Sequence, residues 1–150
     1  MNRRWSDRCR QGRRGTVTVE MALVLPIFTM LVFGIIEFGR GFMIMQLVTN
    51  AAREGCRRGI IDGSTNSDVT SYIQTFMQTS GNVPTSATSV TITVTPAAGN
   101  PSNPGNSLAA CSSRDLVNVK VQIPFSAVQL ITAKYLSGKT LNGEASMRHE

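Results

Sequence analysis

Few residues of this sequence have the types and spacing that catalysis needs. The single histidine, His149, is the penultimate residue, where chain ends fray, so a Ser–His–Asp triad or a zinc site built on it is implausible. Gly39-Arg40-Gly41 is too short for a glycine-rich phosphate loop, and the carboxylates are few and scattered. The sequence therefore predicts a protein that is not an enzyme, with no metal site and no cofactor.

One carboxylate stands in an unusual setting. Glu20 lies inside an apolar run, Val17 to Ile36, in which the only other polar side chains are Thr18 and Thr29. An acid near the start of a membrane span costs about 1 to 3 kcal/mol, and a residue that costly usually has a partner. Glu20 is therefore a candidate for a contact with a partner. The alternative is a hydrated carboxylate at the level of the lipid headgroups.

Two cysteines could form a covalent link. Cys9 lies in the basic N-terminal segment, whereas Cys56 and Cys111 both follow the apolar run. In an oxidising compartment such an even pair indicates a disulfide, and closing a loop of about 55 residues would stabilise the fold by roughly 4 kcal/mol on the chain-entropy model. The alternative is two unrelated cysteines, with Cys56 packed against a sheet.

The apolar run has the length of a membrane span. Its 20 residues, Val17 to Ile36, would form a helix of about 30 Å, which matches the hydrocarbon core of a bilayer. A buried core helix is the alternative, but apolar segments of that kind usually have about 10 to 14 residues. The run is also too long for an ordinary secretory signal, and Glu37-Phe38-Gly39-Arg40 follows it in place of small residues. We therefore expect a transmembrane helix.

The charge of the chain is concentrated before this span. Residues 1–15 contain six arginines against one aspartate, a net charge of +5, whereas residues 16–150 carry only +1. The positive-inside rule then places the N-terminus in the cytoplasm and the C-terminal domain outside, in a single-pass membrane protein. The nearly neutral remainder offers no electrostatic footprint for a phosphate backbone, so we expect no nucleic-acid partner.

The helix should continue beyond the bilayer as a stalk. From Glu37 to Arg58, side chains such as Phe38, Phe42 and Met45 recur at a spacing of three or four residues. Gly59 is a natural stop, so the predicted helix 16–58 would be about 65 Å long. The charges on it can pair along the helix: Glu37 with Arg40, and Glu54 with Arg57 and Arg58.

The remaining residues, 59–150, predict a small α+β domain. A short helix is expected from an N-cap at Ser67 to about Thr79. Alternating patterns predict strands at 90–95, 117–123 and 139–148 in a sheet that is antiparallel, with a short amphipathic segment at 127–136. The chain thus divides into a basic leader (1–15), a transmembrane and stalk helix (16–58) and an extracytoplasmic domain (59–150).

Two stretches resemble a known family. At the end of the leader the chain reads Arg13-Arg14-Gly15-Thr16-Val17-Thr18-Val19-Glu20. This junction between leader and span resembles that of type IV pilin-like precursors. Residues 20–26 and 49–57 are similar to TadE-like proteins, pseudopilins of the Tad (tight adherence) pilus systems, and residues 144–148 look like their last strand. One departure is Cys56, where that family often has a small residue such as alanine.

The resemblance implies a function. A prepilin peptidase would cut between Gly15 and Thr16, and Glu20 would then contact the freed amine of Thr16 in a neighbouring subunit. The protein would be a minor pilin-like subunit in the inner membrane that helps to assemble an adhesive Tad or type IV-like pilus, or a secretion machine. Its partners would be the membrane, the peptidase, other pilin-like subunits and pilus assembly proteins. The alternative is an uncleaved single-pass membrane protein with an outward binding or sensory domain.

Overall fold

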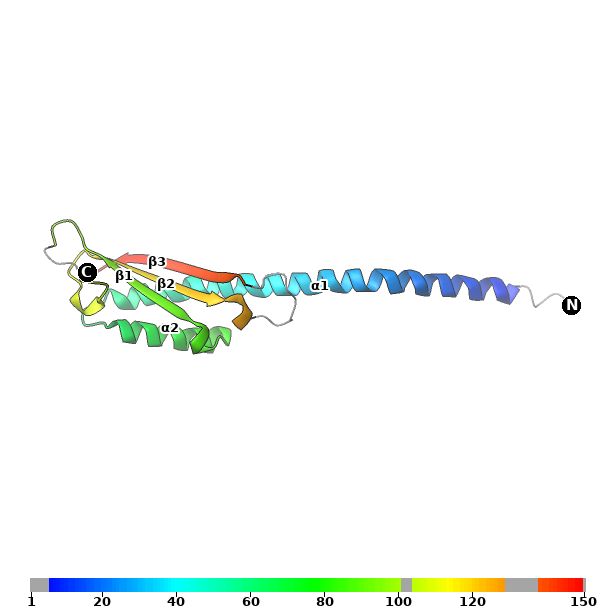
Figure 1. Cartoon of the computed structure of the whole chain (residues 1–150), viewed down its shortest axis with the longest axis horizontal. Coiled ribbons are helices and arrows are strands. Elements are labelled where there is room, and N and C mark those ends of the chain that lie inside the picture. Colours follow the sequence, from blue (N-terminus) through cyan, green and yellow to red (C-terminus); the bar gives the residue numbers. More distant parts are fainter. Residues whose placement is uncertain (1–5, 101–103, 129–137, 150) are drawn as a thin grey trace.

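The computed structural model describes residues 6–100, 104–128 and 138–149, with side chains from residue 15 onward. A long rod, α1, carries a small head around its C-terminal half (Figure 1). The head contains one further α-helix and a three-stranded antiparallel sheet, so the predicted α+β class is confirmed. The elements are α1 (Ser6–Gly59), α2 (Asn66–Gly81), η1 (Thr85–Ala87), β1 (Ser89–Thr95), η2 (Leu108–Ala110), β2 (Leu116–Pro124), η3 (Phe125–Ala127) and β3 (Thr140–Arg148).

The rod is longer than the predicted helix 16–58. It has 54 residues and begins at Ser6, so the basic segment joins it without a break at Gly15. Arginine and glutamine are good helix formers, and an isolated glycine costs only about 1 kcal/mol, so nothing in this segment stops the helix. Pro26 lies inside α1 and does not end it, whereas Gly59, the predicted stop, is the last residue of the helix, one residue beyond the predicted end.

Helix α2 starts earlier than predicted. Its N-cap is Thr65, not Ser67, because the Thr65 hydroxyl accepts the backbone N–H of Asp68 at 3.2 Å. Ser67 lies inside the first turn, with its hydroxyl oxygen 2.9 Å from that of Thr65. The prediction of Ser67 as the cap was therefore wrong by two residues. Both hydroxyls suit an N-cap, and the sequence does not show which one the chain uses.

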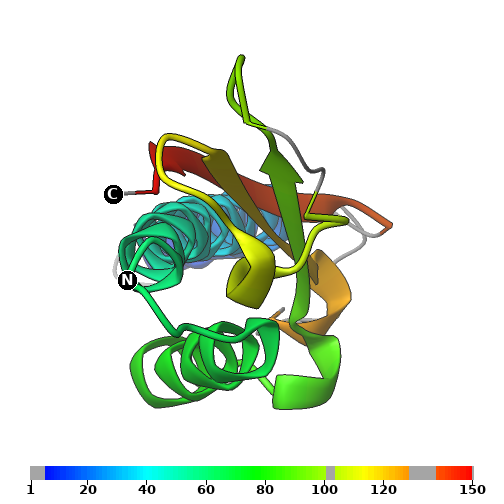
Figure 2. The ribbon, with the colours of Figure 1, turned by 90° about the vertical axis from the view of Figure 1, so that its left-hand side faces the viewer.

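The sheet has the order β1-β2-β3, and both pairs of strands are antiparallel. The three strands confirm the predicted ones to within a residue at each end. The central strand β2 turns its apolar side inward, and Val119 pairs with Ile92 of β1 and Ala145 of β3. Seen along the rod in Figure 2, α2 and the sheet lie on different sides of α1, so the helix supports both layers.

The core lies where α1, α2 and the sheet meet. Two glycines allow β3 and α2 to pack closely against α1. A Cβ on Gly143 of β3 would come within 2.7 Å of the backbone of α1 at Thr49, and a Cβ on Gly55 of α1 would lie 2.5 Å from the side chain of Ile73 in α2. The predicted amphipathic segment 127–136 lies mostly outside the described residues. The largest fully buried side chains include Ile44 and Val48 of α1, Val69, Ile73 and Met77 of α2, and Val117, Val119, Val121, Ile123 and Phe125.

Candidate membrane-spanning and assembly surface

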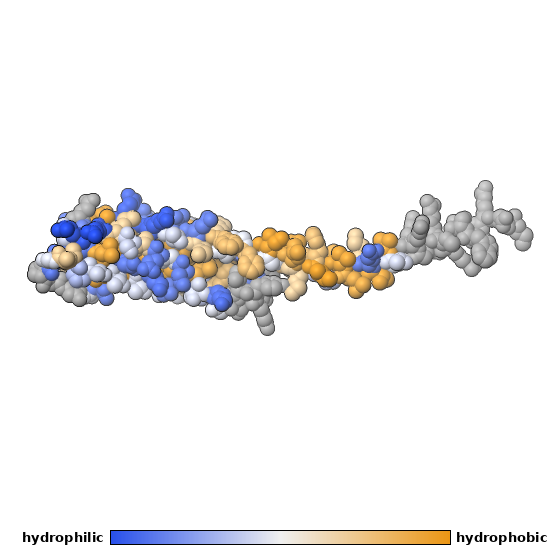
Figure 3. All heavy atoms as spheres, turned by 90° about the horizontal axis from the view of Figure 1, so that it is seen from above, coloured by the Kyte–Doolittle hydropathy of each residue, from blue (hydrophilic) through white to orange (hydrophobic). Residues whose placement is uncertain are grey.

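The half of α1 that the head does not cover is apolar and bare. Between Gly15 and Gly59 the helix is long and apolar enough to cross a membrane, and its most apolar window has no buried residue. This bare half forms the orange neck between the head and the N-terminal end in Figure 3. In water such a surface would be a strong aggregation liability. Its exposed apolar side chains include Val17, Leu23, Leu25, Ile27, Phe28, Met30, Leu31 and Ile35.

The predicted junction and assembly residues lie at the start of this bare half. Gly15, Thr16 and Glu20 are all exposed on α1. A Cβ on Gly15 would meet no atom within 4 Å, so among the described residues no other element packs on the junction. None of the ion pairs between described residues includes Glu20. The carboxylate is therefore open to a partner from outside the chain, which is the condition that the predicted contact requires.

A second acid on α1 has a different environment. Glu37, the first residue after the apolar run, is only 2% exposed, and neither of its carboxylate oxygens has a hydrogen-bond partner in the structure. The predicted pairing with Arg40 is wrong, because Arg40 Nε donates to the backbone carbonyl of Val128 at the base of the head. Glu37 was not among the site residues predicted from the sequence. Its position at the end of the span was the available signal.

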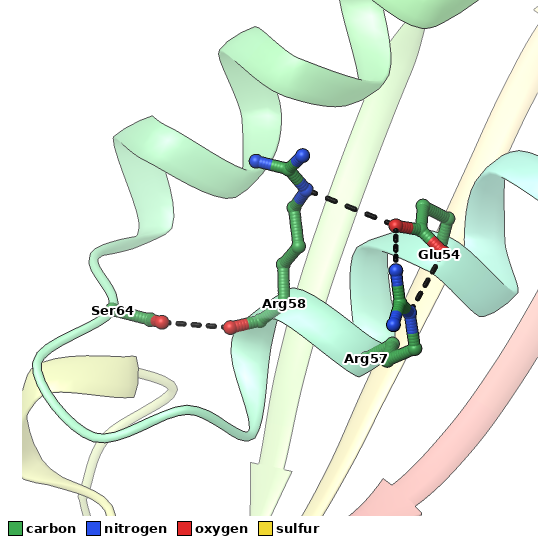
Figure 4. A network of polar contacts seen from close by, with 4 residues as sticks. All are labelled: Glu54, Arg57, Arg58 and Ser64. Carbon is green, nitrogen blue, oxygen red and sulfur yellow. Dashed lines mark hydrogen bonds and ion pairs between the residues drawn. The ribbon is translucent and has the colours of Figure 1, made fainter.

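The other predicted pairs on α1 are confirmed. Glu54 accepts two hydrogen bonds from Arg57, at 3.0 and 2.7 Å, and lies 3.9 Å from Arg58 (Figure 4). The hydrogen bond from Arg57 is the main reason that the pKa of Glu54 is lowered. Arg58 also lies 3.4 Å from the ring centre of Tyr72, and its carbonyl accepts the hydroxyl of Ser64 at 2.7 Å. These contacts connect the end of α1 to α2, and they need no ligand.

The two cysteines of the head, Cys56 and Cys111, are free thiols in the structure. Cys56 is buried against the sheet, with its sulfur 3.0 Å from the carbonyl oxygen of Ala145 in β3. Burial raises the pKa of both thiols, so neither has the character of a reactive thiolate. Cys111 is partly exposed in the segment before β2.

A buried carboxylate organises the end of the sheet farthest from the rod's bare half. Asp115 accepts the backbone N–H of Ala97 at 2.8 Å and that of Ser112 at 2.9 Å, and the Asn100 amide also donates to it. The hydrogen bond from Ala97 is the largest cause of its lowered pKa. His149 is also buried here, and its Nε2 lies 3.6 Å from Oδ1 of the exposed Asp62. These groups serve the fold, because Asp115 holds the loop after β1 to the start of β2.

The described residues offer no metal site, since none of their His, Cys, Asp and Glu side chains gather in groups of three or more. The surface hollows are shallow. One of about 390 Å³ lies on the outer face of α1, and another of about 250 Å³ lies between the end of α1 and the start of α2. The arrangement as a whole is that of an apolar rod with a polar head, suited to insertion and to packing against other proteins.

The comparisons with known proteins agree with this arrangement. Residues 15–57 match the model of the family described as TadE-like protein, which confirms the resemblance found in the sequence. No curated protein and no solved structure matches the chain. The matched segment begins at Gly15 and ends two residues before the end of α1, so it covers the bare half of the rod and the half that carries the head. Over residues 15–57, which form most of α1, this chain is therefore similar to TadE-like proteins.

Proposed function

We propose that this chain is a minor pilin-like subunit of a Tad or type IV-like pilus, or of a related secretion machine, made as a precursor that a prepilin peptidase cuts after Gly15. The observation that carries the proposal is the bare apolar half of α1, which continues without a break into the head-bearing half and coincides with the TadE-like match. A rod of this kind can hold the subunit in the inner membrane and later pack against other rods. The head would lie outside the cytoplasm, and the arginine-rich leader would lie inside.

Glu20 would provide the contact that sets the axial register. After cleavage the amine of Thr16 becomes a positive charge at the end of each rod, about 6 Å from the level of Glu20 along the helix. The Glu20 carboxylate is exposed, so a neighbouring rod can reach it. Opposite charges attract strongly in a medium of low dielectric constant, whereas a mismatched register would leave an unpaired charge in lipid or between rods. One such pair therefore favours one axial offset over the others.

Incorporation of a Glu20 variant tests this function. In cells that carry the other pilus proteins, Glu20→Gln should insert into the membrane at the wild-type level but should fail to enter the assembled pilus fraction. The matched control is Glu144→Gln, which removes a carboxylate from the exposed side of β3 and should assemble normally. Normal incorporation of Glu20→Gln would refute the register role.

A second candidate is an uncleaved single-pass membrane protein with an outward binding or sensory domain. The continuity of α1 through Gly15 and Thr16 favours it, because a peptidase has to unwind a helix locally before it can cut there. Under this alternative the arginine-rich segment would stay attached and hold the rod in one orientation. The protein would then retain residues 1–15 in the membrane fraction.

A further inference from the structure

Two exposed arginines lie at the end of the head farthest from the bare half of α1 (Figure 1). Arg148 is the last residue of β3, and Arg114 lies in the turn just before β2. The backbone N–H of Arg114 donates to the carbonyl of His149 at 2.8 Å, which holds the two arginines at the same end of the sheet. None of the ion pairs between described residues includes either guanidinium.

The backbone of Arg114 has an unusual conformation. Its φ is +77°, in the left-handed region that favours glycine. Other residues keep such a conformation only where the surrounding structure holds it, and these places are common at binding sites. Asp115 supplies that restraint, because it accepts the N–H groups of Ala97 and Ser112. The fold therefore fixes the position of Arg114 on the surface.

Arg114 and Arg148 line a hollow of about 390 Å³, which is within the range of roughly 300 to 1,000 Å³ that small-ligand sites have. No acidic residue is among the described residues that line it. A guanidinium stays charged at any physiological pH, and its planar set of donors matches the two oxygens of a carboxylate. The hollow therefore suits an anionic group. Its other lining residues are Thr95, Pro96, Ala97, Ala98 and Leu116.

The surface beside the hollow indicates what carries that anionic group. The register places Thr95 and Leu116 in one row with Arg148 across the sheet. The next row on the same face consists of Thr93, Asn118 and Ser146. This face points away from the core, because the alternate residues of β2 are the buried ones. Neutral hydroxyl and amide groups are suitable hydrogen-bond partners for sugar hydroxyls, and Leu116, which is 38% exposed, offers an apolar contact.

A phospholipid headgroup is too far away to be the ligand. Strand β3 runs from the end of the head nearest the bare half of α1 to the far end (Figure 1). Its 9 residues extend about 27 Å, so Arg148 lies well beyond the surface of a bilayer that surrounds the bare half. The hollow faces the medium outside that bilayer.

We propose that the hollow lined by Arg114 and Arg148 binds the carboxylate of an acidic sugar, a uronate, in an extracytoplasmic polysaccharide. The outer face of the sheet contacts the hydroxyls of the same polymer. This inference rests on the proposed function for the outward position of the head, and it gives the head a class of ligand. Binding itself needs neither cleavage after Gly15 nor the contact of Glu20.

Calorimetric titration of the purified full chain in detergent with a short oligogalacturonate tests the site. Arg114→Gln and Arg148→Gln should each weaken binding by about fivefold or more, and the double variant should abolish it. The charge-matched control combines Arg53→Gln with Lys139→Gln, two exposed cations outside the hollow, and should bind within about twofold of wild type. The neutral methyl ester of the same oligosaccharide should not bind.

Several results would overturn the proposal. These are no binding of oligogalacturonate by the wild-type chain, equal binding of its methyl ester, or an equal loss in the charge-matched control. Tighter binding of inorganic phosphate or polyphosphate would also overturn the assignment to an acidic sugar. Urea unfolding checks the fold of each variant, and if Arg114→Gln is unfolded, Arg148→Gln decides alone. Processing and pilus incorporation, measured in cells, report on the proposed function independently of this binding.

Discussion

The close passage of β3 over α1 gives a sharp prediction about how the head is attached to the rod. A Cβ on Gly143 would lie 2.7 Å from the backbone nitrogen of Thr49 and 2.7 to 2.8 Å from the carbonyl group of Val48. Ordinary contacts between such atoms are about 3.5 to 4.0 Å long, so Gly143→Ala requires the strand to move away by roughly 1 Å. The obstructing atoms belong to a helix backbone, so no side-chain rotation relieves the clash.

The expected cost follows from this geometry. Overpacking a well-packed core usually costs about 1 to 3 kcal/mol, and β3 is held on its other side by the ladder to β2. With a urea dependence of about 2 kcal/mol per molar, the unfolding midpoint should fall by about 1 M.

The assay is urea unfolding of the full-length chain in detergent, followed by near-UV absorbance. The matched control is Gly39→Ala, a helical site with no atom within 4 Å of a new Cβ, which should be neutral or slightly stabilising. Equal midpoints for Gly143→Ala and wild type would refute the close contact between β3 and α1.

Three further results should follow. Asp115→Asn should be less stable than wild type at neutral pH, and the difference in stability should shrink below about pH 4. The reason is that the pKa of Asp115 is lower in the folded protein than in the unfolded chain. The stabilisation by Asp115 is therefore present above the unfolded pKa of about 3.9 and is lost as the pH falls through the folded pKa. Mass spectrometry of unreduced protein should find Cys56 and Cys111 as free thiols, with Cys111 alkylated before Cys56 under native conditions; a mass lower by two hydrogens would instead show the disulfide. Glu54→Gln should leave the urea midpoint within about 0.3 M of wild type, because its ion pairs with Arg57 and Arg58 are largely exposed; a larger shift would contradict that assignment.

The regular elements of this fold could be read from the sequence because each has one dominant periodic signal. The span is a long apolar run, and β2 alternates strictly from Val117 to Ile123, a pattern that only a half-buried strand explains. The end of α1 at Gly59 was equally accessible, since glycine after the last helical turn is a frequent stop. In each case one local rule and the tertiary structure agree.

Other features depend on contacts that the sequence does not contain. The choice of Thr65 over Ser67 as the cap of α2 depends on how the loop enters the helix. The pairing of Arg40 with Val128 in place of Glu37 joins residues 88 positions apart, which helical spacing does not predict. The burial of Glu37 without a hydrogen-bond partner is likewise a feature of the tertiary structure, which the sequence does not reveal. The start of α1 at Ser6 was missed because a polar segment without an apolar stripe gives no periodic signal.

The most direct test of the account is the N-terminal residue of the membrane-associated protein. The chain should be isolated from membranes of cells with an active prepilin peptidase, after a carbonate wash, and its N-terminus should be determined by sequencing. The account predicts a mature chain that begins at Thr16, and a full-length chain in cells without the peptidase. A protein that begins at Met1 in cells that process other pilin precursors would contradict the account and favour a permanent membrane anchor.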